Sequence, residues 1–298
     1  MISKKTKSKT TSMAISFILP SLLPFCIFMF YPLLRTVYLS FFDWNLVSPN
    51  KKFIGFTNYV NLFKDPITFK VLINTLLYIV ILVIINFIIP YVVSYILHMK
   101  ISRKKDIFKS AIFLPSVISL VVGSILYLWL LNPVSGPLGI ISKMLGIQIP
   151  IWTKTDGLVI VVLSLITSWK VFGYNFIILY AGIMGVDMNV IEAAIVDNVP
   201  GWKIFIDIVL PMSSATGIYV FITTIVQGLQ YVFTPIKVVT QGGPNYASSN
   251  LTYQSYHEGF TLYRVGMSSA FSVLTLIIFG ALLYLEYRYV EMSVYYEN

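Results

Sequence analysis

Long apolar segments alternate with short polar segments along most of the 298 residues. Six of the apolar segments are longer than the roughly 20 residues that a helix needs to cross the hydrocarbon of a bilayer. These segments are residues 13–40, 71–99, 107–131, 158–180, 212–239 and 265–287. Pro20, Pro24 and Pro32 interrupt the first segment and predict a kink or a short re-entrant break there. The pattern predicts an all-α integral membrane protein with six transmembrane helices.

Composition supports this interpretation. Hydrophobic residues make up 57% of the chain and charged residues 11%, and the mean hydropathy is +0.82. A water-exposed surface would need more charge than this. The net charge of +9 comes from cations beside apolar segments, where membrane topology and anionic lipid explain them, so nucleic acid is not an expected partner. The single cysteine, Cys26, allows neither an internal disulfide nor a cysteine metal site.

The distribution of lysine and arginine predicts the orientation of the chain. Eleven cations lie in residues 1–12, 100–109, 186–211 and 288–298, whereas the loops 43–69, 132–156 and 241–264 hold six. Because cytoplasmic loops carry the excess of lysine and arginine, both termini and the loop 186–211 are expected on the cytoplasmic side of the membrane. The expected organisation is a basic segment 1–12, a transmembrane domain 13–287 and a tail 288–298.

The loop 186–211 has the pattern of a helical hairpin that faces water. Asp187 is a suitable N-cap for a helix over residues 188–197. Asn198 tolerates the left-handed conformation that ends such a helix, and Pro200 prevents its continuation. A second short helix is expected over 201–209. Ala193 and Ala194 are small, so the first helix offers a low surface that a groove of another protein could hold closely.

This loop resembles the signature E-A-A-x-x-D-G-A…I-x-L-P of permease subunits from binding-protein-dependent ABC importers. The matching residues are Glu192, Ala193, Ala194 and Asp197, followed by Ile208, Leu210 and Pro211. Asn198 stands where the family has glycine, and Val199 stands where it has alanine. Residues 129–133 and 240–244 resemble other family stretches, and residues 256–261 and 287–291 are most similar to the A-type subunit of glycerol-3-phosphate permeases.

The resemblance implies the type I ABC importer permease (MetI-like) fold, with the hairpin as a cytoplasmic coupling helix. The implied partners are a second permease subunit, a dimer of ATPase subunits and an extracytoplasmic solute-binding protein. The residues expected to contact the ATPase are Glu192, Ala193, Ala194, Asp197, Asn198 and Gly201. This chain has no glycine-rich phosphate loop with its lysine, so we expect ATP and Mg to bind to the partner ATPase and this chain to be neither an enzyme nor a cofactor protein.

Polar residues inside the apolar segments are candidates for a solute path, because such groups are costly in hydrocarbon. Lys170 lies twelve residues into the fourth segment, or about 18 Å along a helix. Thr223, Gln227 and Gln230 share one helix face. The full candidate set is Lys170, Asn175, Thr223, Gln227, Gln230 and Trp129. Snorkelling or a shared structural role for the lysine, hydrogen bonds between helices for the amides, and packing for the aromatics are the alternatives.

The expected function is ATP-driven import of a sugar or sugar-phosphate-like solute, such as an oligosaccharide or sn-glycerol-3-phosphate. An ion-coupled secondary transporter or channel is the alternative. It would need carboxylates deep in the membrane, whereas the segments between their assigned ends carry only Glu286, at the inner edge. A membrane enzyme would need an acid, base or metal cluster that the sequence lacks.

Overall fold

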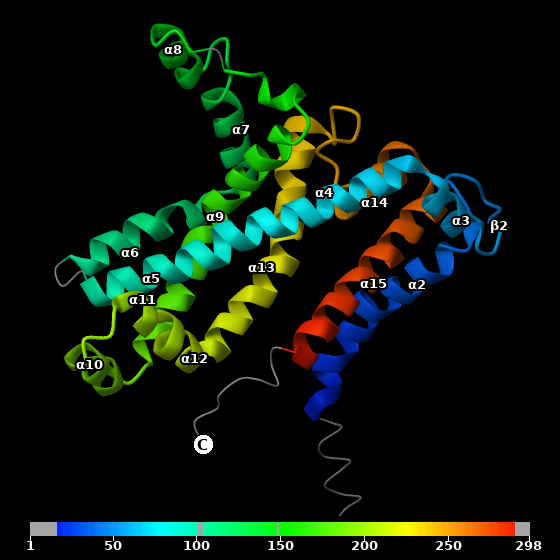
Figure 1. Ribbon diagram of the computed structural model, residues 1–298. Helices are drawn as coiled ribbons and strands as arrows, with labels where there is room; N and C mark the ends of the chain where they lie inside the picture. The colour runs from blue at the N-terminus through cyan, green and yellow to red at the C-terminus, as the bar shows by residue number, and fades with distance from the viewer. Residues whose placement is uncertain (1–16, 101–103, 148, 290–298) are drawn as a thin grey trace, which may run out of the picture. The chain divides into compact units, whose positions relative to one another are not determined.

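The computed structural model describes residues 17–100, 104–147 and 149–289 (Figure 1). The basic segment 1–12, Arg103 and the tail from residue 290 lie outside the described residues. Within these ranges, five helices are long and apolar enough to cross a bilayer: Phe17–Leu39, Pro66–Lys100, Leu158–Met184, Ser214–Thr240 and Val265–Leu285. Two further helices, Lys105–Val117 and Leu120–Leu130, are joined at a sharp bend and make a sixth crossing when they are counted as one broken span. With this broken span, the number of crossings is the predicted six.

One compact part of the chain contains residues 17–64 and 255–274. Its first helix continues from Phe17 through a π-helical turn, η1 (Cys26–Phe30), into α2 (Tyr31–Leu39). The predicted re-entrant break is wrong, since the helix runs on through all three prolines. A widened π turn is one of the ways in which a helix accommodates a disturbed hydrogen-bond ladder.

The connection after α2 is more ordered than the sequence indicated. A two-stranded antiparallel sheet pairs β1 (Phe42–Asp43) with β2 (Lys52–Phe53), and α3 (Thr57–Lys64) follows. The Asn58 amide donates to the carbonyls of Ser40, at 2.8 Å, and Phe42, at 3.0 Å. The same part holds the end of α14 (Leu251–Tyr256), η7 (His257–Thr261) and the start of α15 (Val265–Tyr289). The connection therefore holds a short helix, α3, preceded by a hairpin that was not predicted from the sequence.

The other compact part contains residues 65–254 and the rest of α15. Its second crossing is one continuous helical run of α4 (Pro66–Val83), η2 (Ile84–Ile88) and α5 (Ile89–Lys100). The fourth crossing, α9 (Leu158–Met184), packs against both α5 and α13 (Ser214–Pro235), which continues into η6 (Ile236–Thr240). Figure 1 shows α9 in green between these neighbours. Leu163, Ile166 and Phe176 of α9 are completely buried, so this helix is the centre of the part.

The third crossing differs from its prediction as a single span over 107–131. It consists of α6 (Lys105–Phe113), a 3₁₀ turn η3 (Leu114–Val117) and α7 (Leu120–Leu130), with an angle of 96° between the two halves. Pro115 has no N–H to continue the helical ladder, and Ile118 and Ser119 are extended. The connection after α7 contains α8 (Pro137–Met144) and η4 (Trp152–Lys154). These helices were not predicted from the sequence, because the connection is rich in glycine and proline.

Candidate functional site

The connection between the fourth and fifth crossings forms the predicted hairpin. It contains α10 (Met188–Val196), α11 (Gly201–Lys203), η5 (Ile204–Val209) and α12 (Leu210–Met212). The Asp187 carboxylate accepts a hydrogen bond from the Asn189 N–H at 2.9 Å, which satisfies one free donor of the first turn. Asn198 has a φ of 56°, in the left-handed region that asparagine tolerates. The predicted start and end of the first helix are confirmed.

The inner face of the hairpin is anchored to the membrane helices. Ile191, Ala194 and Ile204 are buried in a cluster with aromatic residues of α5 and aliphatic residues of α9. The Tyr95 hydroxyl of α5 donates to the Gly201 carbonyl at 2.8 Å. Ala194, predicted as part of an outward contact surface, is only 9% exposed and faces this cluster. Its small size therefore serves packing inside the chain.

The outer face of the hairpin carries the remaining predicted contact residues. Glu192, Ala193, Asp197, Asn198 and Gly201 are all exposed. Two large apolar side chains, which sequence reasoning did not select, are exposed beside them: Val196 is 79% exposed and Trp202 is 63% exposed. Val196 lies four residues after Glu192, so helical spacing could have placed it on the same face. We call Glu192, Ala193, Val196, Asp197 and Trp202 the hairpin surface.

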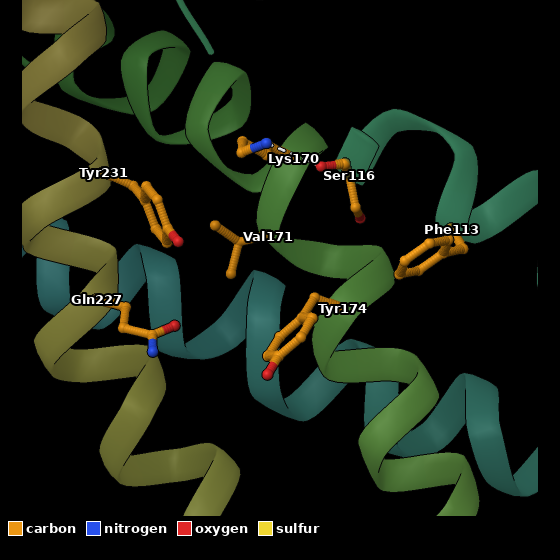
Figure 2. A pocket seen from close by; sticks show the side chains of 7 residues that line it. All are labelled: Phe113, Ser116, Lys170, Val171, Tyr174, Gln227 and Tyr231. Carbon is orange, nitrogen blue, oxygen red and sulfur yellow. Dashed lines mark hydrogen bonds between the residues drawn. The ribbon is translucent and has the colours of Figure 1, made fainter. Parts of the chain in front are cut away.

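A cavity of about 300 Å³ lies between α9, α13 and the bent third crossing (Figure 2). The residues around it are Phe113, Ser116, Lys170, Val171, Tyr174, Gln227 and Tyr231. Of the six predicted path residues, Lys170 and Gln227 meet here. Tyr174 and Tyr231 were not among them, although each follows a predicted residue by four positions and hence lies one helical turn further on. The lining offers ammonium, amide and hydroxyl groups on an otherwise apolar wall.

Lys170 forms hydrogen bonds with the backbone at the bend in the third crossing. Its ammonium donates to the carbonyl of Ser116 at 2.8 Å and to that of Ile118 at 2.9 Å. The three ion pairs recorded over the described ranges do not include Lys170. These contacts match the shared structural role considered for this lysine, while its position in the cavity lining also keeps it near a possible solute.

The other four predicted path residues lie outside this cavity lining. Asn175 is 2% exposed and donates to the Asn86 carbonyl at 2.6 Å and to the Thr224 hydroxyl at 2.8 Å, so it joins α9 to η2 and α13. The Thr223 hydroxyl donates to the Tyr219 carbonyl of its own helix at 2.9 Å. Gln230 is exposed on α13, and Trp129 is exposed at the end of α7.

Six apolar crossings, a hairpin anchored between two of them and a polar-lined cavity between helices define a multi-pass membrane protein of the transport class. Residues 99–294 match the family described as binding-protein-dependent transport system inner membrane component. The chain belongs to this family, the permeases of ABC importers. This confirms the family resemblance that the sequence motifs indicated, and it places the chain among transport permeases instead of enzymes.

Similar proteins cover nearly the whole chain. The probable ABC transporter permease protein YurN of Bacillus subtilis (strain 168) is 30% identical over 276 residues, covering 92% of this chain and 94% of the relative. The sn-glycerol-3-phosphate transport system permease protein UgpA of Agrobacterium fabrum is 27% identical over 278 residues, covering 93% of this chain and 94% of the relative.

Two crystal structures share the fold. A bacterial ABC transporter involved in the import of the acidic polysaccharide alginate has a chain with a TM-score of 0.80 at 20% identity, covering 97% of both chains. A bacterial alginate ABC transporter in complex with an alginate pentasaccharide-bound periplasmic protein has a TM-score of 0.81 at 18% identity, covering 95% of both chains. The predicted permease fold is therefore confirmed.

Proposed function

We propose that this ABC importer permease carries a sugar or sugar-phosphate-like solute, either an oligosaccharide or sn-glycerol-3-phosphate. A relative of similar length is a permease of an sn-glycerol-3-phosphate transport system, and solved structures with the same fold belong to an importer of an acidic polysaccharide. The cavity supports a polar solute, since its hydroxyl, amide and ammonium groups can bind oxygen atoms.

The hairpin surface is the proposed docking site for the ATPase subunit. The observation that supports it best is the division of the hairpin into an anchored inner face and an outer face with exposed apolar and acidic side chains. Exposed side chains as large as Val196 and Trp202 are expected where a partner covers them. In this proposal Glu192, Ala193 and Asp197 contact the ATPase, Asn198 and Gly201 shape the turn behind them, and Ala194 holds the helix in place.

The remaining parts of the proposal follow from the family. A second permease subunit completes the solute path, a solute-binding protein delivers solute from outside, and a pair of ATPase subunits binds ATP and Mg. Both termini and the hairpin lie in the cytoplasm of a bacterium. Gln227 contacts solute in the cavity that Lys170 also lines, while Thr223, Gln230 and Trp129 are candidates for surfaces shared with the second permease. Asn175 supports the path from behind.

The test is uptake by the complete assembly in liposomes, with ATP inside and the binding protein with radiolabelled solute outside. Glu192→Gln and Ala193→Trp are expected to reduce uptake on the order of tenfold, because hot-spot contacts at an interface carry most of its energy. Insertion and helical content should stay unchanged, since both side chains are exposed. Asp43→Asn, which changes an exposed carboxylate in the connection after α2, is the matched control.

The proposal makes a further distinction inside the hairpin. Ala193→Trp should weaken copurification of the ATPase without loosening the hairpin, whereas Ala194→Trp should loosen it, because Ala194 is packed in the core. Normal uptake and normal ATPase capture with both Glu192→Gln and Ala193→Trp would remove the docking assignment. Uptake driven by an ion gradient with no ATPase present would instead support the secondary transporter.

A further inference from the structure

The bend in the third crossing leaves backbone carbonyls without helical partners. Within the described ranges, neither the Ser116 carbonyl nor the Ile118 carbonyl accepts a backbone N–H, whereas the neighbouring Pro115 carbonyl accepts the Ile118 N–H at 3.1 Å. An unpaired backbone group inside a bilayer is costly, because no water is present to satisfy it. The carbonyls at this bend of 96° between two apolar helices therefore need donors, either from the protein or from water in the cavity.

Lys170 supplies these donors. Its ammonium has three N–H groups, and two of them reach the Ser116 and Ile118 carbonyls at 2.8 and 2.9 Å. The ammonium also lies at the carboxyl end of the α6–η3 helix, where the helix dipole favours a positive charge. Figure 2 shows the ammonium directed at Ser116 across the top of the cavity.

Gly173 provides a second point of attachment on the same face of α9, three residues further along. A Cβ atom at this position would overlap the Ile112 carbonyl oxygen and would lie 2.8 Å from the Phe113 Cα. The backbone of α9 therefore packs directly against the backbone at the end of α6, next to the bend. The hydrogen bonds of Lys170 and the close backbone contact at Gly173 together hold the bend against α9.

The position of the bend determines the shape of the solute cavity. Phe113 and Ser116 form the wall of the cavity on the third crossing, and Val171 and Tyr174 line it from α9. In a cavity of about 300 Å³, a shift of that wall by an ångström alters the space available to a solute. We infer that Lys170 is a positioning residue for the transported solute, acting through the Ser116 and Ile118 carbonyls that fix this wall.

This inference rests on the proposed function of the cavity. The test below distinguishes a failure of the inference from a failure of the proposed function. The complete assembly is prepared with Cys26→Ser and spin labels at Val117→Cys and Val161→Cys, both exposed positions on η3 and α9. Lys170→Met, Lys170→Arg and unchanged Lys170 are then compared by electron paramagnetic resonance and by solute uptake. Lys143→Met is the matched control, because Lys143 also donates to a carbonyl, that of Val134, but in the connection after α7.

Lys170→Met should lengthen or broaden the distance between the labels and raise the KM for uptake on the order of tenfold, with kcat changed much less. Lys170→Arg should restore both quantities, since it keeps the donors and the charge. If Lys170→Met does not assemble, Lys170→Gln takes its place. Its amide is uncharged and one bond shorter than the ammonium, so the label distance should change in the same direction.

An unchanged label distance in Lys170→Met would overturn the inference, even if the KM rises, because the lysine would then act on solute directly. Equal behaviour of the Met and Arg variants would overturn it as well. If the unchanged assembly transports no solute, the proposed function fails, while the label distances still decide the role of Lys170 at the bend.

Discussion

Replacing Gly173 with alanine tests the contact between α9 and the bend in the third crossing. The added Cβ would overlap the Ile112 carbonyl oxygen and would lie 2.7 Å from the Ser116 hydroxyl and 2.8 Å from the Phe113 Cα. Two of these neighbours are backbone atoms, so no side-chain rotation can relieve them. Since non-bonded atoms rest at about 3.5 Å, the two backbones must separate by about 1 Å.

The expected loss is about 1–3 kcal/mol of folding free energy, which is typical of an extra methyl group in a tightly packed interior. The sign of the change in folding free energy distinguishes a crowded glycine from an uncrowded one. In a helix without close neighbours, alanine is favoured over glycine by about 1 kcal/mol, so the same substitution should stabilise the protein. Gly280→Ala provides that control, because a Cβ at Gly280 of α15 meets nothing within 4 Å.

The assay is the thermal inactivation midpoint of the purified permease in detergent, followed by size-exclusion chromatography at one heating rate because such unfolding is irreversible. Gly173→Ala should lower the midpoint, and Gly280→Ala should leave it unchanged or raise it. If both variants are as stable as the unchanged protein, the close approach of α9 to the bend is wrong, and the two-point attachment inferred for Lys170 and Gly173 loses one of its points.

Two further predictions concern single polar residues. Asn175→Leu should lower stability by about 1–3 kcal/mol because it leaves the Asn86 carbonyl and the Thr224 hydroxyl without their donor, whereas Gln230→Leu, at an exposed position, should leave the same thermal midpoint unchanged. Asn198→Gly should be neutral or slightly stabilising, and Asn198→Val should cost about 1–3 kcal/mol, since a β-branched residue is strained at a φ of 56°. Amide hydrogen exchange of residues 188–199 would show the second effect locally.

The sequence predicted those features that depend on local chemistry. Apolar length located the crossings, and cap and turn residues such as Asp187 and Asn198 located the ends of the hairpin helix, because each acts on atoms a few residues away. The bend in the third crossing was not predictable in this way. Pro115 disturbs the helix, but the direction of the chain afterwards depends on donors from Lys170, which is more than fifty residues distant.

Helical spacing alone also did not predict which side chains are buried and which are exposed. Ala193 and Ala194 are adjacent and equally small, yet only the second is buried, because α5 and α9 cover one side of the hairpin. Gln227 reaches the cavity, while Gln230, three residues further along α13, is exposed. Which neighbour covers a helix face is a tertiary property that a single segment does not contain.

The unbroken length of α9 has a mechanical consequence. Lys170 and Tyr174 line the cavity, while Leu179 and Ile183, further along the same helix, belong to the cluster that anchors the hairpin. From Lys170 to Ile183 the helix covers about 20 Å without a change of helix type. Because the helix is continuous between these two places, we expect a tilt of the hairpin to move the cavity wall as well.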